Sequence, residues 1–258
     1  MVYSFSRLNS IDNCHYEWKR SYIDNEKGEE NSFALGGSFC HELCEDVANG
    51  KITTKEASER FKNEWHERVY LDYPKFESGY DLKEHYYRKI QPFFDRKAYW
   101  KSKVVAVEEH VVCELPSGEK FQGFIDMQIS NGLSHSILDW KISKVFSGED
   151  LIKKQRQLYL YAFSIHQLKG YYPNKLIFAF FQSPTTPIVI NFSKHYMNEA
   201  IQWAEGQIVK IKKHIEENDF EPNFSKLSKS DGTRDMYCKN LCSHRNSCPY
   251  VEGDYFKQ

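Results

Sequence analysis

The chain has 258 residues, with 35 lysines and arginines against 36 aspartates and glutamates, which gives a formal net charge of −1. A hydrophobic fraction of 40% and a charged fraction of 28% are typical of a folded globular protein and exclude a disordered one. The near-neutral charge gives no global argument for nucleic-acid binding, so any such surface must be local. The N-terminal residues MVYSFSRLNS lack the basic and apolar regions of a secretion signal, and the seven cysteines are an odd number. We therefore expect a cytoplasmic protein whose thiols are reduced or bind metal.

The order of the predicted elements indicates an α/β fold. A helix begins near Gly36 and Gly37 with Ser38 as its cap, and Thr53 and Thr54 cap a second helix that runs to about residue 69. A third helical pattern covers about 81–100. The remaining elements are extended segments at 104–115, 121–129 and 133–142, a helix at 148–167, strands at 175–182 and 188–192, a helix at 194–217 and a polar loop at 219–237. This order predicts a mixed β-sheet flanked by helices.

A β-hairpin is predicted within the sequence FQGFIDMQISNGLSHSILDWK, residues 121–141. Asn131 and Gly132 lie between two extended runs and favour a two-residue type I′ turn. With that turn Ser130 would pair with Leu133, and the numbers of paired residues would sum to 263.

Two carboxylates and a lysine would then share one face of the hairpin. Asp126 and Asp139 become diagonal neighbours about 7–8 Å apart, and Lys141 follows Asp139 by two residues. Carboxylates that converge on a partly apolar face repel each other unless a proton or a cation lies between them, and Mg²⁺ or Mn²⁺ suits such oxygen ligands. The alternative is a solvent-exposed face on which Lys141 forms an ordinary salt bridge.

Four short motifs occur in a fixed order: GSFCHELCE (37–45), GFID (123–126), ILDWK (137–141) and QLYLY (157–161). With them the chain resembles the PD-(D/E)XK nuclease superfamily, in its RecB-like and AddB-like exonuclease branch. The resemblance implies a restriction-endonuclease-like core and a Mg²⁺- or Mn²⁺-dependent deoxyribonuclease. It would be an exonuclease that acts on DNA ends or single strands and leaves 5′-phosphates. The competing class is a non-catalytic DNA-binding or scaffold module that keeps the fold.

The resemblance also implies a metal-binding role for several residues. His41, Asp126 and Asp139 match metal ligands, and the backbone carbonyl of Trp140 matches a further one. Lys141 matches the lysine that positions or activates the attacking water and stabilises the pentavalent phosphate. Without the other motifs, His41 would be interpreted as a structural histidine among apolar neighbours.

A glutamine and a tyrosine on the following helix complete the match. Gln157 and Tyr161 fit the Gln-x-x-x-Tyr motif of the family, and a spacing of four places them on one helical face. Gln155 and Tyr159 fit the same spacing. The residues around Gln157 match the family pattern better, so we favour that register.

Cysteines at the two ends of the chain form a second candidate site. Cys238, Cys242 and Cys248 follow the pattern C-x₃-C-x₅-C and leave a tetrahedral site one ligand short, which Cys14 could supply. In AddB-like nucleases and in four-cysteine CRISPR-adaptation exonucleases such a set holds a [4Fe–4S] cluster. Structural Zn²⁺ and free surface thiols are the alternatives. We predict one nuclease domain over 1–258, with a cysteine module at 1–35 and 219–258, and a core at 36–218 that carries a helical insertion at about 53–100.

DNA, as single strands or duplex ends, is the expected partner. Four basic residues flank the proposed site and are expected to contact phosphates: Lys144, Lys153, Lys154 and Arg156. The nearest aromatic residues that could stack on unpaired bases are Trp140, Phe146 and Tyr159. The chain lacks the ATP-binding pattern G-x-x-x-x-G-K-[ST], so a helicase, or a recombination or CRISPR-adaptation partner, would be a separate chain. No apolar run is long enough to cross a membrane.

Overall fold

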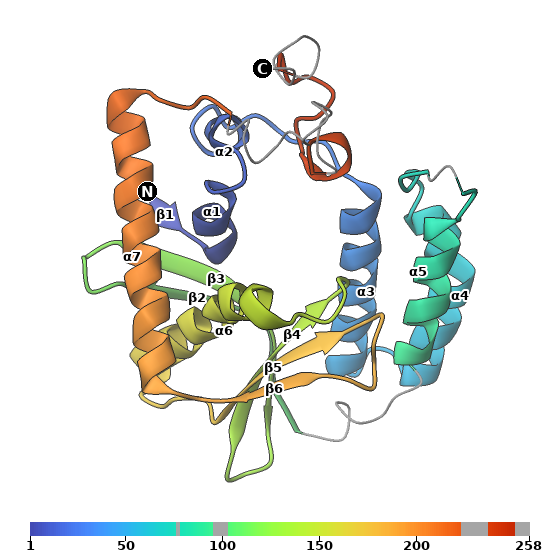
Figure 1. Ribbon diagram of the computed structural model, residues 1–258. Coiled ribbons are helices and arrows are strands. Elements are labelled where there is room, and N and C mark those ends of the chain that lie inside the picture. Colours follow the sequence, from blue (N-terminus) through green and yellow to red (C-terminus); the bar gives the residue numbers. More distant parts are fainter. Residues whose placement is uncertain (76–77, 95–102, 223–236, 251–258) are drawn as a thin grey trace. The chain divides into compact units, whose positions relative to one another are not determined.

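The computed structural model describes residues 1–75, 78–94, 103–222 and 237–250. The chain divides into two units, which we call the core unit (Ser32–Ile201) and the terminal unit (Met1–Asn31 with Gln202–Gln258). Figure 1 shows the elements of both. Among the residues described, no helix is long and apolar enough to cross a membrane.

Three helices precede the sheet in the core unit. Helix α3 (Ser32–Ala48) begins earlier than predicted, so Ser38 lies inside it and the predicted cap is wrong. Helix α4 (Thr54–Arg68) is capped by Thr53, which is one of the two predicted cap residues, and Glu56 completes a capping box. Helix α5 (Leu82–Ile90) gives way to a 3₁₀ turn, η1 (Gln91–Phe93), because the proline in that turn cannot continue an α-helix. The rest of the predicted helix, at 95–100, lies outside the described residues.

The sheet of the core unit is mixed, as predicted. Its strands lie in the order β2 (Lys103–Glu114), β3 (Lys120–Ser130), β4 (His135–Lys141), β5 (Lys175–Phe180) and β6 (Ile188–Asn191). Only β4 and β5 pair in parallel among these strands, and α6 (Gly148–Lys169) forms the crossover that a parallel pair requires. Helix α7 (Lys194–Glu217) has the predicted bounds and crosses the boundary between the two units.

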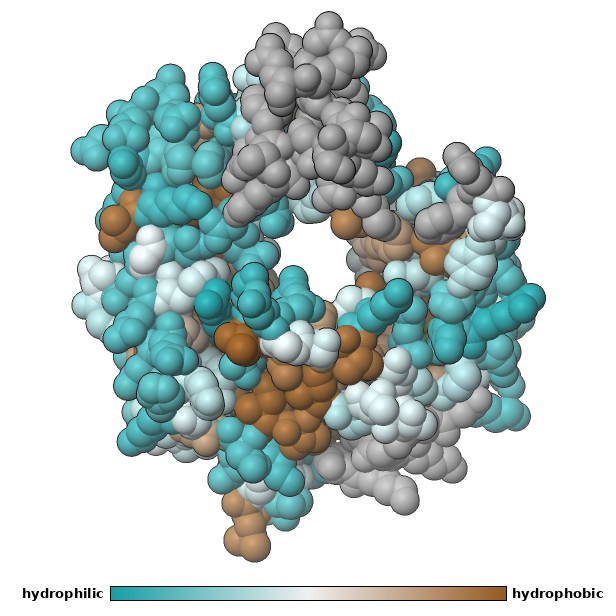
Figure 2. Space-filling view, in the orientation of Figure 1, coloured by the Kyte–Doolittle hydropathy of each residue, from teal (hydrophilic) through white to brown (hydrophobic). Residues whose placement is uncertain are grey.

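The turn between β3 and β4 is longer than predicted. Ser130 pairs with His135, which leaves a four-residue loop in place of the two-residue turn. The side-chain oxygen of Asn131 accepts hydrogen bonds from the backbone N–H groups of Leu133 (3.3 Å) and Ser134 (2.9 Å). This local bonding competes with the type I′ geometry. Leu133 is 97% exposed, and Figure 2 shows apolar atoms at the tip of this hairpin, at the bottom of the view.

The longer turn changes which residues lie opposite each other. Met127 pairs with Leu138, so paired residue numbers sum to 265, not 263. A shift of two residues leaves every side chain on its predicted face. Continued by one residue, the observed register places Asp126 directly opposite Asp139, whereas the predicted register made them diagonal neighbours.

Alternate side chains of β4 lie in two different environments. Leu138 and Trp140 belong to a large buried cluster that includes Phe39 of α3 and Phe61 of α4. Lys141 instead donates a hydrogen bond to Gln157 of α6, at 3.1 Å. The carboxyl end of β4 therefore lies between an apolar core and a polar cluster that includes α6.

The terminal unit holds short helices that the sequence did not predict. They are α1 (Phe5–Ser10) and α2 (His15–Tyr22), and the unit also contains β1 (Val2–Tyr3) and a π-helical turn, η2 (Tyr237–Leu241). Asp12, which follows α1, accepts hydrogen bonds from Gln207 and Lys210 of α7, both at 2.6 Å. Most of the predicted loop at 219–237 lies outside the described residues.

Candidate active site

His41 of α3 presents one ring nitrogen to a buried carboxylate. Its Nε2 lies 3.1 Å from the backbone oxygen of Trp140 and can donate to it, and its Nδ1 then lies unprotonated 3.6 Å from Oδ2 of Asp126. Burial lowers the pKa of His41. A neutral imidazole fixed by a backbone carbonyl is the form that binds a metal ion.

Asp126 is buried at the point where β3 and β4 stop pairing. Its Oδ2 accepts a hydrogen bond from the backbone N–H of Trp140, at 2.6 Å. Burial raises the pKa of Asp126 well above its usual range, and the negative charge of Asp139 raises it further. Ionisation of Asp126 is therefore unfavourable beside the negative charge of Asp139 unless a cation or a proton compensates it.

Glu108 is a candidate ligand that the sequence analysis missed. The pairs Val107–Met127 and Glu109–Ile125 place Glu108 opposite Asp126 on the neighbouring strand. Ligand atoms of His41, Glu108 and Asp126 all lie within 4.8 Å of one another. Burial raises the pKa of Glu108, with smaller contributions from nearby carboxylates.

The backbone of Glu108 explains why sequence patterns did not point to it. Its φ of 48° is left-handed, which is uncommon for a residue other than glycine. Strand periodicity therefore does not predict its direction. The available signal was the pair Glu108 and Glu109, two consecutive acidic residues within an otherwise largely apolar strand.

A chain of polar contacts leads from β4 to α6. The Nζ of Lys141 lies 2.6 Å from Oδ2 of Asp139, a residue that is only 2% exposed. The same Nζ donates to Oε1 of Gln157 at 3.1 Å, and Nε2 of Gln157 donates to the hydroxyl of Tyr161 at 3.0 Å. Gln157 and Tyr161 thus form one contact network with Lys141.

Tyr159, which belongs to the alternative Gln-x-x-x-Tyr register on α6, packs against other residues. The ring of Tyr159 has its centroid 6.2 Å from that of Phe192 and 6.0 Å from that of Tyr196. Tyr161 instead packs so closely on β3 that a Cβ atom at Gly123 would lie 2.3 Å from its Cε1. A glycine at 123 is therefore required by this close approach.

The predicted DNA-contacting residues differ in exposure. Lys144 and Lys153 are exposed, Lys153 lies 3.8 Å from Glu149, and Lys154 and Arg156 are half-buried. The aromatic residues that we expected to stack on bases are buried, and that expectation is wrong: Trp140, Phe146 and Tyr159.

In the terminal unit, three of the four predicted cluster cysteines influence one another. Cys14, the N-cap residue of α2, and Cys238 share a buried cluster with Tyr16 and Tyr237. Burial raises the pKa of Cys14 to about 11, with a contribution from Cys238, and burial also raises the pKa of Cys242, to which Cys14 adds. Cys248 is half-buried, and none of the cysteines forms a disulfide. Among the described residues, no three of these sulfur atoms lie within 4.8 Å of one another.

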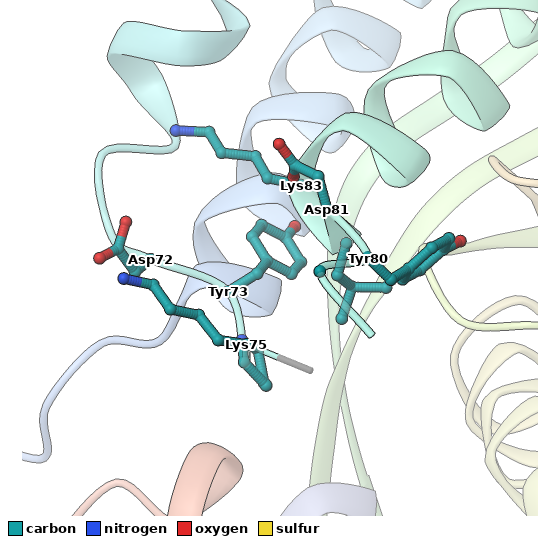
Figure 3. A pocket seen from close by; sticks show the side chains of 9 residues that line it. Asp72, Tyr73, Lys75, Tyr80, Asp81 and Lys83 are labelled. Carbon is teal, nitrogen blue, oxygen red and sulfur yellow. The ribbon is translucent and has the colours of Figure 1, made fainter. Parts of the chain in front are cut away.

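A cavity of about 360 Å³ lies in the connection between α4 and α5 (Figure 3). Two lysines and two aspartates are among its lining residues: Asp72, Lys75, Asp81 and Lys83. Asp81 accepts a hydrogen bond from the N–H of Glu84 as the N-cap of α5, and Lys83 donates to the backbone oxygen of His66. Because its charges balance and two of them have structural roles, we assign no chemistry to this cavity.

Comparison with known proteins identifies the family to which this mixed α/β fold belongs. The family model of the PD-(D/E)XK nuclease superfamily matches residues 2–249, and the chain belongs to this superfamily. A solved structure from Eubacterium rectale, of a protein proposed to be an exonuclease, has a TM-score of 0.56 at 14% identity and covers 97% of this chain and 89% of its own. The structure of SSO0001 has a TM-score of 0.35 at 16% identity and covers 93% and 96%. The first likeness supports the fold, and the second is too low to carry an argument. No match was found among curated proteins.

Proposed function

We propose that the protein is a divalent-metal-dependent deoxyribonuclease that degrades DNA ends or single strands as an exonuclease and leaves 5′-phosphates. The observation that carries this proposal is the convergence of His41, Glu108 and Asp126 beside the ion pair of Asp139 and Lys141. Membership of a nuclease superfamily supports it independently.

The residues fit a hard divalent cation. One imidazole nitrogen and two carboxylates form a donor set that suits Mg²⁺ or Mn²⁺, and Asp139 and the carbonyl of Trp140 are further candidate ligands. The raised pKa values of Glu108 and Asp126 show that the site disfavours uncompensated negative charge. A bound cation would compensate that charge.

Each remaining residue has a defined part in the proposed hydrolysis. When bound, the metal would polarise the scissile phosphate and lower the pKa of a water molecule. Lys141, held by Asp139 and Gln157, places a positive charge where negative charge develops in the transition state. Tyr161 fixes the side-chain amide of Gln157 and thereby the position of Lys141.

We also propose that Cys14, Cys238, Cys242 and Cys248 hold a [4Fe–4S] cluster, with structural Zn²⁺ as the alternative. The packing of Cys14 against Cys238 in one buried cluster supports this, because it brings the two ends of the chain together at two of the proposed ligands. The test is the iron, sulfide and zinc content of anaerobically purified protein, with its visible absorption spectrum. A helicase or CRISPR-adaptation partner stays a prediction.

A nuclease assay tests the main proposal. Single- and double-stranded DNA labelled at the 5′ or the 3′ end is incubated with Mn²⁺ and with wild type, Asp139→Ala, Lys141→Ala or Lys55→Ala. Lys55 is an exposed lysine of α4 and serves as the matched control. We expect wild type and Lys55→Ala to cut and the other two to lose at least about 100-fold in rate. An inert wild type, or equal cutting by all four, would favour a non-catalytic DNA-binding or scaffold module.

A further inference from the structure

A stacked pair of aromatic rings lies on β2 and β3, two residues along each strand from a candidate metal ligand. His110 of β2 and Phe124 of β3 are cross-strand partners, with ring centroids 4.6 Å apart and planes at 16°. The side chain of Gln122 lies 3.2 Å from Nε2 of His110 and fixes the orientation of the imidazole. The pair is therefore a preformed aromatic surface.

This surface is open although the strands around it are well packed. Phe124 is 52% exposed, and His110 is exposed as well. The neighbouring residues Val111, Gly123 and Ile125 are buried. The exposure of the rings thus comes from the alternation of side chains along paired strands, and not from a frayed sheet end.

The position of the pair relates it to the proposed chemistry. Phe124 precedes Asp126 by two residues, and His110 follows Glu108 by two, so the Cα atom of each ring residue lies within about 7 Å of the Cα atom of a candidate ligand. Bases in a stacked strand are about 3.4 Å apart. A base one or two nucleotides from the scissile phosphate is therefore within reach of the rings.

We infer that His110 and Phe124 form a stacking platform for an unpaired base of the substrate, one or two nucleotides from the scissile phosphate. The inference rests on the proposed nuclease function. Stacking on an aromatic ring tolerates any base, because every base has a π face. It requires a free face, which a base inside a duplex does not have. The platform therefore selects single strands or frayed ends without selecting a sequence.

Binding and cleavage by matched variants test the platform. Phe124→Ala removes the ring, Phe124→Tyr keeps it, and Tyr196→Ala removes an aromatic ring of similar exposure from α7. Affinity for single-stranded oligonucleotides is measured with Ca²⁺ in place of Mn²⁺, and a single abasic residue is moved through the oligonucleotide. Values of kcat and KM are measured with Mn²⁺.

We expect Phe124→Ala to bind about 10- to 100-fold more weakly, and to raise KM with little change in kcat. Phe124→Tyr and Tyr196→Ala should resemble wild type. One abasic position should weaken binding by wild type to a similar extent and have no further effect on Phe124→Ala. If wild type cuts DNA and Phe124→Ala has the same affinity and KM, the platform is refuted and the nuclease proposal stands. If wild type neither binds nor cuts DNA, both fail together.

Discussion

The close contact between Gly123 and Tyr161 allows a quantitative prediction about stability. An alanine Cβ at position 123 would lie 2.3 Å from Cε1 of Tyr161, 3.1 Å from Cζ and 3.2 Å from Cδ1. The first distance is far below an ordinary contact of 3.4 Å or more, so the ring must move by about 1 Å. Tyr161 is 5% exposed and is bonded to Gln157, so it cannot move without disturbing its neighbours.

We expect Gly123→Ala to destabilise the protein by about 1–3 kcal/mol, the usual cost of inserting a methyl group into a packed interior. For a chain of this size that corresponds to a fall in Tm of about 2–4 °C per kcal/mol. Denaturant unfolding followed by circular dichroism measures it. The displaced Tyr161 should also shift Gln157 and Lys141, and a misplacement of about 1 Å can cost about 100-fold in rate.

Gly37→Ala is the matched control. Its Cβ would lie 3.6 Å from Ile142, an ordinary contact, and position 37 is inside α3, where alanine stabilises a helix by about 0.5–1 kcal/mol relative to glycine. In a Tyr161→Ala background Gly123→Ala should have almost no effect, because the clash is gone. An alanine at 123 that leaves stability unchanged in the wild-type background would refute the steric argument.

Three further predictions concern the ligands. Because burial raises the pKa values of Asp126 and Glu108, their favourable contribution to apo stability is lost as pH rises through the raised values, and metal binding must displace their protons at low pH. Mn²⁺ should therefore raise Tm more at pH 8 than at pH 5, and Asp126→Asn should reduce the difference; equal increases at both pH values would contradict this. Glu108→Gln should weaken Mn²⁺ binding at least about 10-fold by calorimetry, whereas Glu109→Gln, whose partners lie outside the ligand group, should not. Cys14→Ser should lower the bound iron content and Cys113→Ser, on β2, should not; iron retained by both variants would remove Cys14 from the proposed cluster.

The sequence predicted the elements of the core unit better than the contacts between them. Residue alternation and the Asn131–Gly132 pair correctly indicated the hairpin and the shared face of its carboxylates. The predicted turn length was wrong because the side-chain oxygen of Asn131 accepts hydrogen bonds from two backbone N–H groups of the loop, which favours a longer loop. Turn propensities do not take account of these bonds. Glu108 was missed because its direction depends on a left-handed backbone and on the pairing of β2 with β3.

The His110–Phe124 pair was not predicted for the same reason, because it depends on the register between β2 and β3. Nothing in the separate strands 104–115 and 121–129 indicates which of their residues pair with each other. The aromatic residues that the sequence analysis selected near the motifs are buried. The short helices α1 and α2 were missed because they are too short to show a convincing periodicity.

The left-handed backbone at Glu108 affects which substitutions evolution can accept at this position. A non-glycine residue in this conformation costs about 1–2 kcal/mol, so glycine at 108 would relieve strain while it removed a carboxylate from the candidate ligand group. Selection for stability alone would thus favour loss of this acidic group. If Glu108 is retained in natural variants of this chain, the retention reports selection for activity, and replacement by glycine would mark descendants that keep the fold after giving up catalysis.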